Sequence, residues 1–230
     1  MNAVLRFDDT REVADLAAFL GRLIHYDRAA AVRLQAGGGA LAVFGRPPSF
    51  EVLAIRTARL MDDALVLDVT VAAGELLESL DEAECAARVP SAVTGPPWAG
   101  VLPPRGGWQP VPGLPEPERM RGAVAAAVAE FRARDEALPE QRRTRAEREV
   151  IGREIWSRTL GSTELPLRAV HAAQSLGFLR PVRALASAGA PVAPDPVTLF
   201  VSGPWLRLRT PYGSIALRRA GLGGLTVTPA

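Results

Sequence analysis

Residues 96–115 read PPWAGVLPPRGGWQPVPGLP and separate two halves of different composition. The stretch holds seven prolines, four glycines and two of the four tryptophans. Proline fixes φ and removes a backbone donor, so the run can form neither a helix nor a central strand. Trp98 and Trp108 can together bury about 300–500 Å², which is not typical of a flexible linker. We therefore expect an ordered connector docked on the folded halves, with an exposed polyproline ligand as the alternative.

The two halves also differ in charge. Residues 1–115 carry 10 Arg and 14 acids, a net of −4, whereas residues 116–230 carry 17 Arg and 11 acids, a net of +6. All 27 basic residues are Arg, whose planar guanidinium makes bidentate contacts with carboxylate and phosphate. We predict an acidic α+β domain over 1–95, the connector over 96–115 and a basic helical module over 116–230. The charge asymmetry indicates an acidic partner for this last part.

Size and cysteine content set broad limits. A chain of 230 residues with 48% apolar composition can bury a substantial core. Its one cysteine, Cys85, excludes an internal disulfide and fits a reducing compartment. The first residues lack the pattern of a signal peptide, and no apolar run approaches the roughly 20 residues that span a bilayer. We expect a cytoplasmic protein without a membrane partner.

In the first half the apolar period changes from that of a helix to that of strands. Steps of three and four residues predict a helix over 10–26, with Asp9 or Thr10 as its N-cap. Three glycines at 37–39 precede a strand rather than a helix, so a hairpin turn is favoured over a phosphate-binding loop. The other predicted elements are strands over 3–7, 31–35, 41–44, 51–60 and 65–71 and a short helix over 73–79.

The second half begins with helical patterns. An alanine-rich helix is predicted over 117–136, and self-association through it would give a homo-oligomer. Residues 141–160 hold the densest charge, but pairs such as Arg145–Glu149 and Glu154–Arg158 are four residues apart on a helix. Such pairs neutralise one another. A solvated helix face is therefore favoured here over a nucleic-acid surface.

A further helix is predicted over 165–176, after a turn of about three residues. Two helices joined in this way are compatible with a helix-turn-helix. Arg168, His171 and Gln174 would lie on the polar side of the second helix, where they could contact base edges. An ordinary solvated face is the alternative interpretation.

The chain ends in predicted strands over 197–201, 205–210 and 214–219. If Thr210 pairs with Gly213, apolar residues gather on one face of the last hairpin. The other face then collects Trp205, Arg207, Arg209 and Arg218. A glycine bulge at the Pro-Tyr-Gly turn would shift the pairing by one residue. We favour the unshifted register, because the shifted one would bury an arginine.

These patterns predict an α+β fold with an antiparallel amino-terminal half and a helical carboxyl-terminal half that ends in a β-hairpin. The hairpin after two helices resembles the layout of a winged-helix module. The leading hypothesis is a non-catalytic nucleic-acid-binding or regulatory protein, with the first half serving protein contacts. Its candidate binding residues are Arg168, His171, Gln174, Trp205, Arg207, Arg209, Arg218 and Arg219.

Two other hypotheses stay open. A protein–protein adaptor could present the same basic surface to an acidic protein without binding nucleic acid. An enzyme is third, because no nucleophile elbow, Walker loop or dinucleotide fingerprint is present. With two histidines and one cysteine, no metal-ligand spacing stands out. We therefore expect no catalytic residues, no metal and no cofactor.

Overall fold

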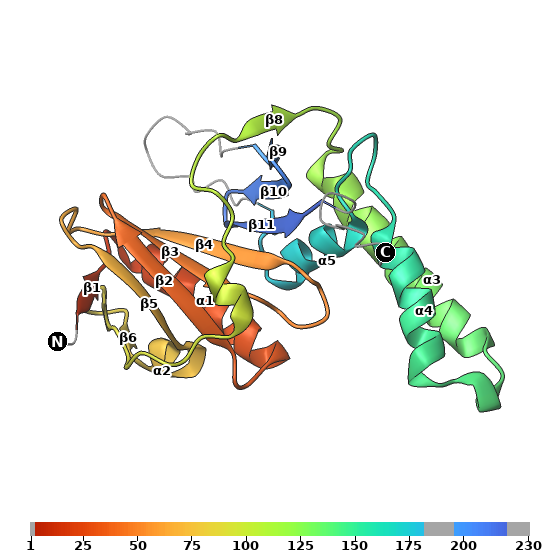
Figure 1. The fold of residues 1–230 in the computed structure, drawn as a ribbon, viewed down its shortest axis with the longest axis horizontal. Coiled ribbons are helices and arrows are strands. Elements are labelled where there is room, and N and C mark those ends of the chain that lie inside the picture. Colours follow the sequence, from red (N-terminus) through yellow and green to blue (C-terminus); the bar gives the residue numbers. More distant parts are fainter. Residues whose placement is uncertain (1–2, 182–195, 220–230) are drawn as a thin grey trace, which may run out of the picture.

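The computed structural model describes residues 3–181 and 196–219, and its fold is α+β. Within these residues, one antiparallel sheet has eight strands in the order β5-β2-β3-β4-β11-β10-β9-β8. A smaller sheet has the order β1-β7-β6. Figure 1 shows helix α1 behind the large sheet and helices α3 and α4 projecting to one side.

The large sheet takes strands from both halves of the chain. Its strands, in sheet order, are β5 (Leu67–Ala72), β2 (Ala31–Gly37), β3 (Ala40–Gly45), β4 (Leu53–Arg59), β11 (Gly213–Arg218), β10 (Trp205–Thr210), β9 (Thr198–Ser202) and β8 (Gln109–Val111). The small sheet consists of β1 (Val4–Arg6), β7 (Ala86–Arg88) and β6 (Leu80–Asp81). The helices are α1 (Thr10–Tyr26), α2 (Ala73–Glu78), α3 (Pro117–Ala137), α4 (Arg145–Ser157) and α5 (Leu167–Ser175), with 3₁₀ turns η1 (Pro97–Gly100) and η2 (Glu140–Arg142).

Local sequence signals place most of these elements. Helix α1 has the predicted bounds, and the Asp9 side chain accepts a hydrogen bond from the Glu12 amide at 2.9 Å, as an N-cap does. The glycines at 38 and 39 have positive φ and form the predicted hairpin turn between β2 and β3. The prediction missed β6 and β7, because strands of two and three residues are too short to show a period.

The last hairpin has the unshifted register. Thr210 pairs with Gly213, and Leu208 pairs with Ile215. Gly213 has φ 154°, and a Cβ there would lie 2.6 Å from the ring of Phe178, so only glycine fits. The hairpin is not a free wing, because β11 also pairs with β4. Strand periodicity indicates which face a residue occupies, but it does not indicate which strand will lie alongside.

The pairing of β4 with β11 joins the two halves into one sheet. Its register is Ser214 to Ile55, Ile215 to Ala54 and Ala216 to Leu53. The division into domains over 1–95 and 116–230 stays a prediction, and residues 220–230 lie outside the described residues. The structure shows that these two regions are joined by the backbone pairing of β4 with β11.

Each face of the large sheet has its own apolar cluster. On the helix side, Leu20 of α1 and Val170 of α5 join one core with Leu34 and Ile215 of the sheet. The opposite side, which we call the outer face, carries a smaller cluster of Phe44, Leu53, Ile55, Trp205 and Ala216. Trp98, Leu102 and Trp108 of the connector pack against this second cluster. The connector therefore covers part of the outer face.

Polar contacts fix the connector in place. Arg33 donates to the Ala99 carbonyl at 2.7 Å, and the Ser202 hydroxyl donates to the Gly106 carbonyl at 3.3 Å. The connector also adds β8 to the sheet edge beside β9, where Pro110 is tolerated. Strands from both halves thus hold this segment.

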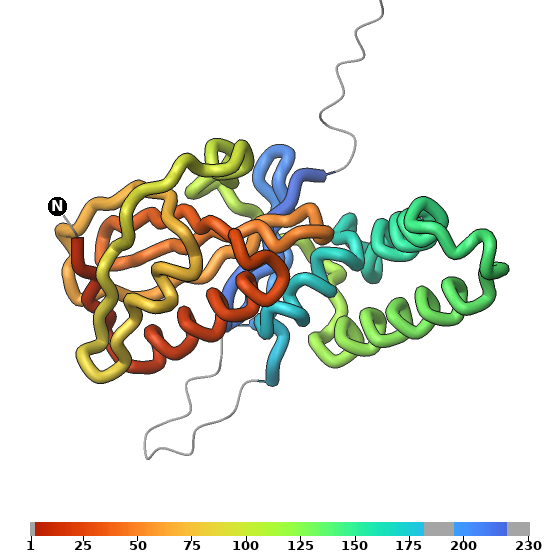
Figure 2. The backbone as a smooth tube through the Cα atoms, turned by 90° about the horizontal axis from the view of Figure 1, so that it is seen from below, coloured from red at the N-terminus to blue at the C-terminus, as the bar shows by residue number. Residues whose placement is uncertain are grey.

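Helices α3 and α4 form an arm that projects from the body, and they lie side by side in both Figure 1 and Figure 2. At its base, Met120, Val124 and Ala127 of α3 are buried. Helix α5 contacts both arm helices and β11. It therefore connects the arm to the helix side of the sheet.

A buried arginine reinforces the junction of β4 and β11. Arg56 of β4 is 7% exposed and contacts the carboxylates of Glu12 and Asp15 on α1 at 3.1 and 3.2 Å. It also donates to the Tyr212 carbonyl, in the turn between β10 and β11, at 3.1 Å. One guanidinium thus links α1, β4 and the last hairpin.

We predict that Arg56→Ala lowers the free energy of unfolding by about 3 kcal/mol, because it leaves the partly buried Glu12 without its cation and Asp15 with Arg180 alone. The measurement is urea denaturation followed by circular dichroism. Arg59→Ala, at an exposed position of the same strand, is the matched control and should change stability little. Equal effects of the two substitutions would contradict this role for Arg56.

Candidate functional site

The residues predicted to bind an acidic partner lie on two opposite sides of the large sheet. Arg168, His171 and Gln174 are on α5, which packs on the helix side. Trp205, Arg207 and Arg209 alternate along β10 on the outer face, and Arg218 pairs with Trp205 across the hairpin. The structure therefore does not bring the eight residues together.

The α5 residues are largely occupied within the fold. Nε of Arg168 is buried and lies 3.7 Å from a carboxylate oxygen of Glu51. His171 stacks on Trp156 with ring centroids 4.4 Å apart and meets Phe50 edge-on. Gln174 is exposed. Because five of the nine residues of α5 are buried, the helix presents little surface to a groove of DNA.

Arg219 faces away from the outer-face residues and forms an ion pair with Glu164. Its Nε and Nη2 donate to the two carboxylate oxygens at 2.6 and 2.9 Å. The pair lowers the pKa of the Glu164 carboxyl through these hydrogen bonds. A phosphate would have to compete with this bidentate contact.

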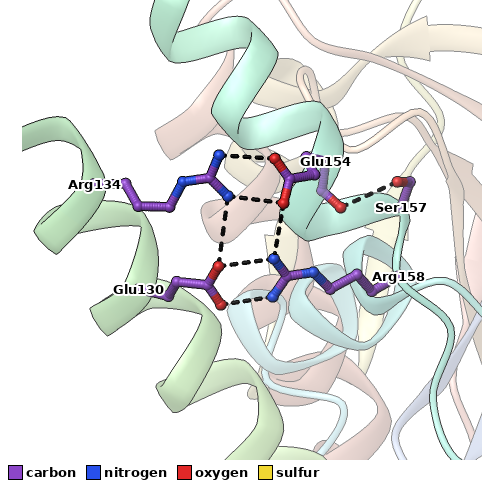
Figure 3. Close-up of polar contacts among 5 residues, drawn as sticks. All are labelled: Glu130, Arg134, Glu154, Ser157 and Arg158. Atoms are coloured by element: carbon purple, nitrogen blue, oxygen red, sulfur yellow. Dashed lines mark hydrogen bonds and ion pairs between the residues drawn. The ribbon is translucent and has the colours of Figure 1, made fainter. Parts of the chain in front are cut away.

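Most arginines of the arm are likewise paired, as Figure 3 shows for Arg134 and Arg158. The exposed Arg119, Arg132 and Arg153 have no carboxylate within ion-pair distance in the described part of the chain. Glu154 accepts from Arg134 at 2.7 Å and from Arg158 at 3.1 Å, and Glu130 contacts the same two arginines. Hydrogen bonds from Arg134 and Arg158 lower the pKa of Glu154 to about 2. The spacing of charges predicted the Glu154–Arg158 and Arg145–Glu149 pairs, and both are present.

Other contacts within the arm neutralise arginines that sequence spacing left unpaired. Arg148 of α4 contacts Asp135 of α3 at 2.7 Å, and Arg142 of the 3₁₀ turn η2 contacts Glu147 of α4 at 2.6 Å. Arg143 instead donates to two backbone carbonyls. The densest charge in the sequence is therefore largely satisfied within the protein.

On the outer face, two arginines lie beside tryptophan rings and lack a carboxylate partner among the residues that the structure describes. Arg218 is exposed and lies over the Trp205 ring at 5.4 Å. The Cζ atom of Arg207 lies 5.7 Å from the centroid of the Trp108 ring. The Nε atom of Arg207 is buried and has no hydrogen-bond partner among the described residues. Burial and the nearby charge of Arg209 lower the pKa of the Arg207 guanidinium. We call Trp108, Trp205, Arg207, Arg209 and Arg218 the basic sheet face.

A pocket of about 370 Å³ adjoins the basic sheet face. Its polar lining residues are Gln35, Thr57, Arg105 and Arg207, and no carboxylate from the described part of the chain lines it. Its roof includes Pro103 and Pro104 of the connector, whereas Thr57 belongs to β4 and Arg207 to β10. Strands from both halves and the connector are therefore all needed to build it.

Residues 103–222 match the family model described as Domain of unknown function (DUF8185). The chain belongs to this family. Residues 1–100 match a second family model, described as Domain of unknown function (DUF8010). A search of curated proteins found no match.

The DUF8185 segment contains the whole basic sheet face, but the pocket is shared. Arg105 and Arg207 belong to this segment, whereas Gln35 and Thr57 lie in the segment matched by DUF8010. The β4–β11 pairing is what places these groups on one face. Among the described residues, no helix combines the length and apolar character needed to cross a bilayer.

Sequence reasoning missed three of the four polar residues of the pocket. Gln35 and Thr57 are single polar residues in strands, and period-two alternation marks them only as facing away from the helix-side core. Arg105 is the one charged residue of the connector, which was the available signal. Their proximity to Arg207 depends on long-range pairing that spacing does not reveal.

We predict that His171 makes stability depend on pH. Burial lowers its pKa in the folded state, so the unfolded chain binds a proton more readily as pH falls through about 6.5. The free energy of unfolding should therefore decrease on acidification from pH 7.5 to pH 5.5, and His171→Phe should flatten this decrease. Urea denaturation at several pH values measures it.

The matched control is His25→Phe, since His25 is exposed and is the other of the two histidines. This variant should keep the wild-type decrease. An unchanged pH dependence in His171→Phe would show that the ring between Trp156 and Phe50 does not govern acid sensitivity.

Proposed function

We propose that this protein is a cytoplasmic, non-catalytic nucleic-acid-binding or regulatory protein that takes a single strand on the basic sheet face. The observation that carries the proposal is the presence of Arg207 and Arg218 beside tryptophan rings and without carboxylate partners in the described chain. Arginine contacts phosphate, and aromatic rings stack on unpaired bases. The half-buried Trp108 is the ring that a base would reach.

A single strand suits this surface better than a duplex. The basic residues lie on sheet strands rather than on a projecting helix, and α5 is mostly packed in the interior. Sheet faces with aromatic and basic side chains bind splayed bases, whereas duplex readout uses an element that enters a groove. Arg209, which is exposed on the same face, would add a phosphate contact.

A protein–protein adaptor without nucleic-acid binding is the second candidate. The projecting arm favours this candidate, because α3 and α4 extend from the body (Figure 1). Ion pairs among Glu130, Arg134, Glu154 and Arg158 hold the two helices together (Figure 3). A preorganised helical surface costs little entropy on binding. Partners recovered with the full chain after nuclease treatment would favour the adaptor.

We predict that the full chain binds a labelled single strand of about 12 nucleotides and that Arg207→Gln combined with Arg218→Gln weakens this binding. Each lost phosphate contact should also reduce the salt slope by about 1. Fluorescence anisotropy titrations at about 50 and about 200 mM salt measure both quantities. DNA and RNA strands and a duplex of the same sequence are compared.

The charge-matched control replaces two arm arginines, as Arg145→Gln with Arg148→Gln. Arg145 is 93% exposed, and both side chains pair with carboxylates. Removing them leaves the basic sheet face intact, so affinity should change by less than about twofold. The proposal fails if no strand or duplex binds at low salt, or if both double variants lose equal affinity.

A further inference from the structure

The pocket beside the basic sheet face has a floor, walls and a roof of distinct chemistry. Its floor includes Gly37, Ala40 and Ala42, whose small side chains leave the space open. Phe44 and Ile55 supply apolar walls, and residues 103–105 of the connector form the roof. A volume of about 370 Å³ lies at the lower end of the range for small-molecule sites.

The charges in this pocket are of one sign. Among the described residues, Arg105 and Arg207 line it and no Asp or Glu does, although Asp68 contacts the lining residue Gln35. Arg105 makes a long contact of 3.5 Å to the Gln35 side-chain oxygen, and its charge helps to lower the pKa of the nearby Asp68 carboxyl. Nε of Arg207 is buried and, like Nε of Arg56 and Arg168, has no hydrogen-bond partner among the described residues, although buried donors are normally satisfied. An anion in the pocket would give the Arg207 guanidinium an acceptor.

We propose that the pocket is a binding site for one nucleotide, with Arg207 and Arg105 contacting its phosphate and the Phe44 side receiving its base. This inference rests on the proposed function for the choice of a nucleotide over other flat anions. The nucleotide is either free or part of a bound strand, and both sources offer the same phosphate and base.

The lining residues match the parts of a nucleotide. Guanidinium groups bind phosphate oxygens in bidentate fashion. The flat wall at Phe44, together with Pro103 and Pro104, provides apolar contact for a base. The Gln35 amide donates to Asp68 at 3.1 Å, and its second N–H and its oxygen can still meet a base edge. The pocket adjoins Arg209 on the same face of β10, so a strand on the basic sheet face can place one nucleotide in it.

The test uses nuclear magnetic resonance of the labelled full chain titrated with uridine or adenosine 5′-monophosphate, and separately with inorganic phosphate. Saturable shifts are expected at the amides of Gly37, Ala42 and Thr57. Ala40→Phe fills the floor at an exposed strand position without changing charge, and Arg207→Gln removes one of the two cations. Arg207→Gln should weaken mononucleotide binding about tenfold or more, as loss of a charge-assisted contact does. Ala40→Phe should weaken it as well, because its ring occupies the space of the ligand. Arg145→Gln is the control and should bind like the wild type.

The site is supported if mononucleotides shift only these amides and if Ala40→Phe abolishes the shifts. This result would stand even if no oligonucleotide binds, and only the proposed function would then be wrong. A strand that displaces the mononucleotide identifies a nucleotide of the strand as the occupant, and binding without displacement identifies a free nucleotide. The proposal is overturned if mononucleotides leave these amides unshifted, or if Ala40→Phe binds like the wild type. It is also overturned if inorganic phosphate binds as tightly as the nucleotides.

Discussion

The backbone ladder between β4 and β11 is the contact on which the rest of the structure depends. Three residue pairs join strands that are more than 150 residues apart in sequence, and Arg56 ties the same junction to α1 and to the turn at Tyr212. Without this pairing the last hairpin, β10 and β11, would expose a hydrophobic edge, and the connector would have no continuous surface to cover. The helix-side core and the outer face both extend across this junction.

The distribution of paired and unpaired arginines follows from this architecture. Where two helices run side by side, as in the arm, carboxylates from one helix reach arginines of the other. On the outer face of the sheet, neighbours of Arg207 and Arg218 are aromatic or apolar, so their charges are not compensated in the same way. An uncompensated, partly buried guanidinium is costly unless a ligand completes it. The tryptophan rings beside these two arginines are why the sheet, rather than the more highly charged arm, is our candidate binding surface.

Periodicity predicted what depends on near neighbours in the chain. The bounds of α1, the hairpin turn at glycines 38 and 39 and the register of Thr210 with Gly213 all follow from local spacing and burial. The same reasoning placed Trp205, Arg207, Arg209 and Arg218 on one face of the last hairpin, as the register shows.

Interactions between distant segments were beyond such reasoning. Arg148 has no carboxylate at helical spacing, yet Asp135 of the other arm helix pairs with it. His171 lies on the polar side of its helix pattern, but Trp156 and Phe50 enclose it. Gln35 and Thr57 gain significance only because β4 lies beside β11, which brings Arg207 onto the same face. Each case depends on a tertiary contact, which sequence spacing does not encode.

Native-state hydrogen exchange of the β4 and β11 amides tests the junction most directly. If the two strands form one cooperative unit, their hydrogen-bonded amides should open with a common free energy equal to that of global unfolding. If the β11 amides exchange through an opening of lower free energy while the β4 amides stay protected, the two halves are independently stable. The pocket and the basic sheet face would then lack the rigid support that our account gives them.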